Sequence, residues 1–121
     1  PAELGGAGGL PTPGWLLRAG LAACAATRIA MEAATEGLVL EELAVSASST
    51  SDARGLWAMA GESGQAVSAA PTGVHLKVRV RAAGVSRERL EALIADSCRC
   101  SPVTAALVNA VPVALETDSG G

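Results

Sequence analysis

The longest regular feature of the chain is an apolar segment that runs from residue 13 to residue 35. Ala and Leu dominate it, and almost every direction around a helix would be apolar. Thr12 suits the N-cap position, Pro13 suits the first helical position, and Gly37 follows as a C-terminal stop. The pattern therefore predicts one long helix over 13–35 that is central and buried.

Two further segments, 38–49 and 74–81, alternate between apolar and polar residues, which predicts two strands. The inward face of the first consists of Leu43, Val45 and Ala47. The inward face of the second consists of Val74, Leu76, Val78 and Val80. Such alternation is typical of an antiparallel sheet with one face in water. Residues 48–70, between the strands, are mostly small and polar and predict a long loop.

The last third of the chain predicts two helices and a strand. A helix begins after Ser86 as its N-cap, and Pro102 breaks it. A short helix follows over 104–109, and a final strand over 111–116 turns Val113 and Leu115 inward. The order of elements predicts an α+β fold. We expect a Gly/Pro-rich lead-in (1–12), a single domain (13–117) and a short tail (118–121).

Composition limits both the core and the partners. The 121 residues include no Phe or Tyr and only two Trp, so small side chains must form the core through close helix packing, with a shared dimer core adding to it. The net charge of −3 gives no attraction to nucleic acid or to an anionic membrane. Because Arg18, Arg28 and Glu32 interrupt the long helix, we do not expect it to span a membrane.

Three cysteines are an odd number, and no basic region followed by an apolar stretch opens the chain. We therefore expect a reducing, cytoplasmic location and no disulfide framework. Cys24 lies within the apolar helix, in the sequence LAACAAT. It is either a small packed hydrophobe or a reactive thiol, which would need a nearby cation. Arg28, one turn further on, is the nearest cation unless it pairs with Glu32.

Cys98 and Cys100 close the second long helix, about 200° apart around its axis, so they are poorly placed to bond to each other. With His75 they make a poor zinc set, because a fourth ligand and the usual spacing are missing. His75 itself belongs to the polar face of its strand, beside Lys77, Arg79 and Arg81. We expect no metal and no cofactor.

Several motifs together resemble the OsmC/Ohr family of thiol peroxidases. The segment G-G-x-x-G-x-P-T-P-G-x-L-L-R-A-x-L-A-A-C-x-A-T at 5–27 is similar to the family's central-helix signature. D-A-R-G-L at 52–56, the strand at 74–82, and V-S-R-E-R-L, S-P-V-T-A-A-L and V-P-V within 85–113 follow in the family's order. The resemblance covers nearly the whole chain.

The resemblance implies an interlocked homodimer in which a curved antiparallel sheet wraps the central helices. It also implies that Cys24 attacks an organic hydroperoxide and becomes a sulfenic acid. A second cysteine, the first residue of a C-P-x-S-like motif, would then form a disulfide with it, and an external dithiol would complete turnover.

The chain departs from this family pattern at three places. Ser101 occupies the resolving position, with Cys100 beside it as the candidate substitute, and Gly14 replaces a Glu of the peroxidases. The arginine that stabilises the family's thiolate comes from N-terminal strands that we expect this chain to lack. Two hypotheses follow: an OsmC-like hydroperoxide reductase that uses Cys24 and Cys100, or a non-catalytic OsmC-like dimer that binds a small apolar ligand.

Overall fold

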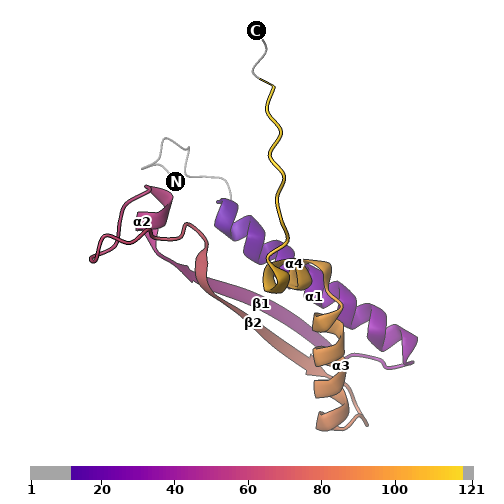
Figure 1. The fold of residues 1–121 in the computed structure, drawn as a ribbon. Helices are drawn as coiled ribbons and strands as arrows, with labels where there is room; N and C mark the ends of the chain where they lie inside the picture. The colour runs from indigo at the N-terminus through magenta and orange to yellow at the C-terminus, as the bar shows by residue number, and fades with distance from the viewer. Residues whose placement is uncertain (1–11, 119–121) are drawn as a thin grey trace.

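The computed structural model describes residues 12–118 and contains four helices and two strands in that range. The predicted lead-in lies outside the described residues except for Thr12, and the predicted tail does so except for Asp118. The order is α1 (Pro13–Thr35), β1 (Glu42–Ser51), α2 (Ala53–Leu56), β2 (Pro71–Arg81), α3 (Arg87–Arg99) and α4 (Pro102–Asn109). Figure 1 shows the two strands as a long antiparallel pair, with α1, α3 and α4 beside it and α2 in the connection at its far end. The mixed α+β architecture is as predicted.

Helix α1 begins and ends where the sequence predicts. The Thr12 hydroxyl accepts a hydrogen bond from the Trp15 backbone N–H at 3.1 Å, which satisfies one of the free donors of the first turn. At the other end Gly37 has a φ of +71°, a left-handed conformation that costs glycine little. The predicted helix bounds are therefore confirmed.

The burial of α1 differs from the prediction. Only one face is buried, and it consists of Leu21, Ala25, Ile29 and Ala33. Trp15, Leu16 and Met31 are each more than half exposed. The reason is that a two-stranded sheet and two short helices have too little surface to surround a helix of 23 residues. The prediction of a helix buried on all sides is wrong for the single chain.

Strands β1 and β2 pair in antiparallel register, with Val45 opposite Val78. The inward residues of β1 are partly buried as predicted, and so are three of the four inward residues of β2; Val74 is 43% exposed. The connecting segment is not entirely a loop, because Asp52 caps the short helix α2 through the Arg54 backbone N–H at 3.0 Å.

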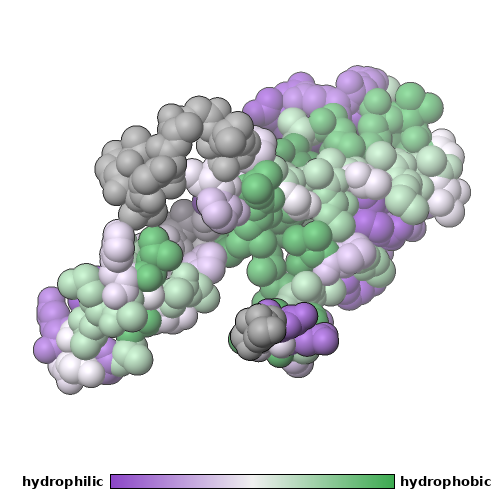
Figure 2. Space-filling model, turned by 90° about the horizontal axis from the view of Figure 1, so that it is seen from above, coloured by the Kyte–Doolittle hydropathy of each residue, from purple (hydrophilic) through white to green (hydrophobic). Residues whose placement is uncertain are grey.

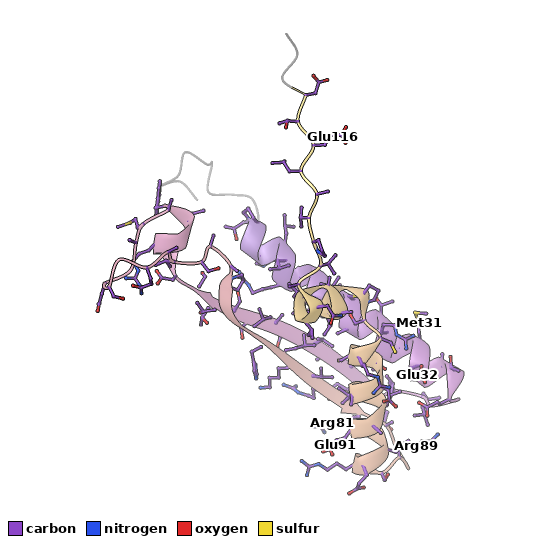
Figure 3. The ribbon with its side chains drawn as sticks, viewed as in Figure 1. Met31, Glu32, Arg81, Arg89, Glu91 and Glu116 are labelled. Atoms are coloured by element: carbon purple, nitrogen blue, oxygen red, sulfur yellow. The ribbon has the colours of Figure 1, made fainter. Side chains whose placement is uncertain are left out.

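Helix α3 is capped by Ser86, whose hydroxyl accepts a hydrogen bond from the Arg89 backbone N–H at 3.2 Å. It ends at Arg99, just before Pro102, as predicted. The predicted strand over 111–116 is wrong: this segment has no regular structure, and Val113 and Leu115 are 93% and 89% exposed. A strand needs a hydrogen-bonded neighbour, and the segment extends away from the rest of the chain, as Glu116 shows in Figure 3.

The core lies where α1, α3 and the hairpin meet. Its buried centre is Ile29, Ala33 and Leu93. The partly buried residues around it are Leu38, Leu40, Leu43, Val45, Val78, Val80, Leu90 and Ile94. Full burial of a side chain such as Ile29 stabilises the fold by roughly 1.5–3 kcal/mol. This core fixes how α3 crosses α1 and so positions the residues that follow α3.

Candidate active site

Cys24 lies in the middle of α1, half-buried, on the side that faces α3 and α4. Its closest polar neighbour comes from the far end of the sequence. The Ser101 hydroxyl donates a hydrogen bond to Cys24 Sγ across an Oγ–Sγ distance of 3.0 Å. The fold thus brings together two of the predicted site residues, Cys24 and the residue at the family's resolving position.

Ser101 is held firmly in this place. It is fully buried, and it occupies the N-cap position of α4, directly before Pro102. Serine at an N-cap usually accepts a hydrogen bond from the helix backbone, yet here the hydroxyl makes no such bond. Its hydrogen-bond partner is Cys24 Sγ, so the Ser101 side chain bonds to the cysteine and not to the helix backbone.

Three contacts connect α1 with the second half of the chain. Arg89 forms an ion pair with Glu36 at 4.0 Å, Leu93 packs in the core beside Ile29 and Ala33, and Ser101 contacts Cys24. The first part of α3 therefore lies near the C-terminal end of α1, and the residue before α4 reaches the middle of α1.

Two polar atoms, one in α1 and one in α3, are buried and have no hydrogen-bond partner among residues 12–118: Arg28 Nε and Ser97 Oγ. Ser97 is fully buried, whereas Arg28 extends its Nη2 to Glu32 Oε2 at 3.3 Å. The predicted Arg28–Glu32 pair is therefore present. A buried polar atom without a partner loses about 1–3 kcal/mol of solvation, so such atoms often mark a position for a water or a ligand.

The other two cysteines lie apart from this contact. Cys100 is exposed and ends α3, where its backbone N–H donates to the Asp96 carbonyl at 3.2 Å. Cys98 is half-buried, and burial raises the pKa of its thiol. All three cysteines are free, and no hydrogen bond joins Cys24 to Cys100 in the part of the chain that the structure describes. A catalytic role for Cys100 stays a prediction.

An apolar groove of about 150 Å³ adjoins the site between α1, β2 and α4. It is lined by Leu21, Val74, Leu76, Thr104, Leu107 and Val108. Neither Cys24 nor Ser101 lines the groove, but Leu21 is one turn before Cys24 and Thr104 is three residues after Ser101. Thr104 Oγ1 is a third buried atom without a partner within 12–118.

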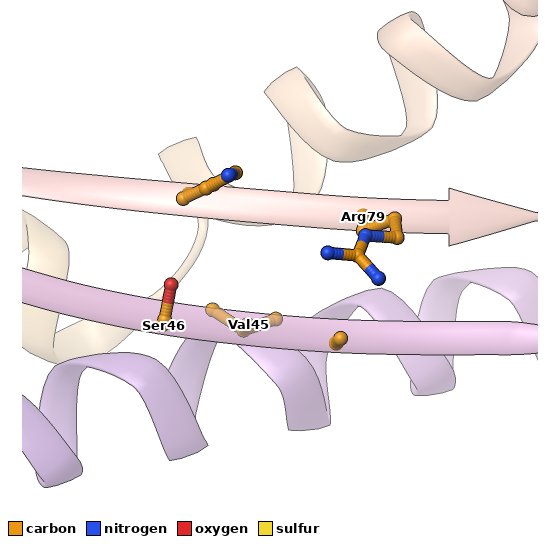
Figure 4. Close-up of a pocket in the computed structure, with 5 residues that line it drawn as sticks. Val45, Ser46 and Arg79 are labelled. Carbon is orange, nitrogen blue, oxygen red and sulfur yellow. The ribbon is translucent and has the colours of Figure 1, made fainter.

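A second recess, of about 220 Å³, lies on the hairpin and is lined by Ala44, Val45, Ser46, Lys77 and Arg79. Figure 4 shows Ser46 and Arg79 on neighbouring strands there. It contains no thiol. His75 is exposed on β2, as predicted for a polar strand face. Between residues 12 and 118 no three His, Cys, Asp or Glu side chains are grouped in a way that could hold a metal ion.

The model of the OsmC-like protein family matches residues 6–116. The chain belongs to this family. A solved structure of an OsmC-like protein from Mycoplasma pneumoniae superposes with a TM-score of 0.64 at 16% identity, over 79% of this chain and 61% of that one. That match shows the OsmC-like fold alone. The chain spans less than two thirds of the Mycoplasma protein's length.

A second solved structure is described as an organic hydroperoxide resistance protein OsmC and redox protein from Legionella pneumophila. It is 25% identical, with a TM-score of 0.59, over 88% of this chain and 69% of that one. A search of the curated proteins found no match. No helix within the described part of this OsmC-like chain is long and apolar enough to cross a membrane.

The sequence identified Cys24 and Ser101 as site residues but indicated a different role for the serine. In the family pattern the position of Ser101 belongs to the resolving cysteine, so the sequence indicates only that a thiol is missing there. In the structure the Ser101 hydroxyl is the hydrogen-bond partner of Cys24. Ser97 and Thr104 were not predicted as site residues. The signal for Ser97 was the helical spacing, since it follows Leu93 by four residues on the buried face of α3.

Proposed function

We propose that this OsmC-like protein reduces organic hydroperoxides by thiol chemistry at Cys24. The observation that carries the proposal is the hydrogen bond from Ser101 Oγ to Cys24 Sγ. Because the hydroxyl donates, this contact orients the sulfur and can stabilise negative charge that develops on it during the reaction. The thiolate is the form that attacks a peroxide. The description of the Legionella protein as an organic hydroperoxide resistance protein supports the same chemistry.

The substrate is a hydroperoxide with an apolar organic group. The groove beside Cys24 presents Leu21, Leu76 and Leu107, which suit a hydrocarbon group. The peroxide end then meets the sulfur, which takes the terminal oxygen and releases the organic part as an alcohol. No metal or other cofactor takes part, and an external dithiol returns Cys24 to the thiol. Three free cysteines suit a reducing compartment, for which we propose the cytoplasm.

The working unit that we propose is a homodimer. Figure 2 shows hydrophobic residues exposed over much of the surface seen from above. The exposed apolar side chains include Trp15, Leu16 and Met31 of α1 and Val111 and Val113 of the C-terminal segment. Large exposed apolar areas usually mark protein contacts. A second copy would cover α1 and supply a neighbour for the unpaired segment 111–116; sedimentation equilibrium would return the mass of a single chain if this were incorrect.

The activity is tested by measuring consumption of cumene hydroperoxide by the purified chain with dithiothreitol as reductant. We expect turnover with the wild-type chain and none with Cys24→Ser. Cys98→Ser is the matched control, because Cys98 is a half-buried thiol outside the proposed site, and it should turn over at the wild-type rate. Equal rates for wild type and Cys24→Ser, or no consumption by either, would refute the proposal.

A second candidate function rests on the groove itself. An apolar recess whose buried Thr104 Oγ1 lacks a partner among the described residues is suited to an apolar ligand with one hydrogen-bonding group. A non-catalytic protein would bind such a ligand, for example a fatty acid, without using Cys24. Calorimetric titration of decanoate into wild type and Cys24→Ala separates the two functions, since tight binding by both, together with no peroxide turnover, would favour the binding protein.

A further inference from the structure

Ser101 occupies the place from which a second thiol would have to act. Its oxygen lies 3.0 Å from Cys24 Sγ, within reach for a bond if it were sulfur. Oxygen cannot form a disulfide, so after oxidation of Cys24 the Ser101 hydroxyl can contribute only a hydrogen bond.

The neighbouring thiol cannot simply replace it. Cys100 is exposed while Ser101 is fully buried, so their side chains point to different sides of the turn. Two backbone hydrogen bonds hold this turn: Cys100 N–H to the Asp96 carbonyl at 3.2 Å, and Ser101 N–H to the Cys98 carbonyl at 3.1 Å. Bringing Cys100 Sγ to Cys24 would break this arrangement and remove the buried Ser101 hydroxyl from its partner.

The site instead contains a donor that suits an oxygen atom. The Ser101 hydroxyl is fully buried, makes no capping bond to α4 and donates to Cys24 Sγ at 3.0 Å. A sulfenic acid places one new oxygen beside the sulfur, within reach of this hydroxyl.

We propose that Cys24 is a single-cysteine redox centre whose sulfenic acid is resolved by a low-molecular-weight thiol from solution and not by a cysteine of this chain. The inference rests on the proposed peroxidase function. In the first step the Cys24 thiolate breaks the O–O bond and takes the terminal O–H group as a sulfenic acid, while the organic alkoxide leaves and takes a proton from solvent to become the alcohol. An external thiol then forms an S–S bond to Cys24 and water leaves. A second external thiol attacks this mixed disulfide, restores the Cys24 thiol and departs as the external disulfide.

The groove explains why the attacking thiol is small. Cys24 is half-buried, and the recess beside it holds about 150 Å³. Because Cys24 is only half-buried, a low-molecular-weight thiol can reach its sulfur, and the Ser101 hydrogen bond holds that sulfur in place. Ser101 is a positioning residue in this scheme, because it does not exchange electrons with the substrate.

The test is intact-mass and peptide mass spectrometry of the full chain after one equivalent of cumene hydroperoxide, followed by one equivalent of glutathione, so that no second thiol is present to remove the adduct. We expect wild type to gain the mass of one glutathione, on Cys24, and Cys100→Ser to do the same. The Ser101→Cys variant should instead form an internal disulfide between Cys24 and the introduced thiol and lose the adduct, since a sulfur then replaces the oxygen that contacts Sγ.

Each other outcome contradicts the proposal in a distinct way. A disulfide between Cys24 and Cys100 or Cys98 in wild type would overturn the single-cysteine centre and leave the peroxidase function standing. A glutathione adduct on the Ser101→Cys variant in place of the internal bond would overturn the role given to position 101. An unmodified Cys24 would overturn both the inference and the proposed function.

Discussion

Replacing Ser101 with alanine removes the hydrogen bond to Cys24 and little else. The deleted atom is Oγ, which donates to Cys24 Sγ at 3.0 Å and makes no capping bond to α4. A hydrogen bond to a charged acceptor contributes about 1.5–3 kcal/mol. Sulfur is a weak acceptor, so we take the lower value, and about 1.4 kcal/mol corresponds to a factor of ten in an equilibrium constant. The rate at which the Cys24 sulfur reacts should therefore fall roughly ten-fold.

The assay is the rate at which iodoacetamide alkylates Cys24 at neutral pH, followed by peptide mass spectrometry. Ser97→Ala provides the matched control, because it removes a hydroxyl that is equally buried, one turn away and without a partner among residues 12–118. We expect roughly ten-fold slower alkylation in Ser101→Ala and less than about two-fold change in Ser97→Ala. Equal rates in the two variants would show that the Ser101 contact does not activate the sulfur.

Three other predictions concern the surroundings of the site. Ile29→Ala should lower the free energy of unfolding by about 2–5 kcal/mol in urea titrations, because it empties the core centre; a loss well under 1 kcal/mol would contradict this. Hydrogen bonds from Arg54 hold the pKa of Asp52 below its ordinary 3.8, so their stabilising effect is present above pH 3.8 and lost as the pH falls through the folded value. Carbon NMR titration should show the pKa of Asp52 rising toward 3.8 in Arg54→Ala, and an unchanged midpoint would refute the pairing. Burial raises the pKa of Cys98, so at pH 8 it should be alkylated more slowly than exposed Cys100, and the reverse order on peptide mapping would argue against that burial.

Local signals in the sequence were enough to predict most of the regular structure. Thr12, Pro13 and Gly37 define the ends of α1, and Ser86 and Pro102 define those of α3, because caps and prolines act within a few residues. Alternation in the two strands indicated an antiparallel pair with one wet face, and the two strands do pair in this way. These features depend on residues that are close in the sequence and not on contacts between distant segments.

Predictions that depended on distant contacts were less successful. The apolar pattern of 13–35 indicates a buried helix, but how much of it is buried depends on what covers it, and one chain covers only one face. Val113 and Leu115 have the alternation of a strand, yet no neighbour for them lies within the described residues. Both differences concern surfaces that a second copy would cover in the proposed homodimer.

The sequence predicted the residues of the candidate site, Cys24 and Ser101, but not the contact between them. Cys24 and Ser101 are separated by 77 positions, and their contact depends on how α3 crosses α1. The family pattern has a cysteine where this chain has Ser101, so the pattern alone indicates only that a thiol is missing at this position. The contact shows what the serine supplies, which is a buried hydroxyl directed at the sulfur.

The proposed function depends above all on Cys24 being the residue that a hydroperoxide oxidises. The most direct measurement adds one equivalent of cumene hydroperoxide to the full chain in the presence of dimedone, which traps sulfenic acids, and locates the adduct by peptide mass spectrometry. We predict one dimedone on Cys24 in wild type and none in Cys24→Ser. A chain that remains unmodified, or that carries dimedone on Cys98 or Cys100 with Cys24 still reduced, would contradict the proposal.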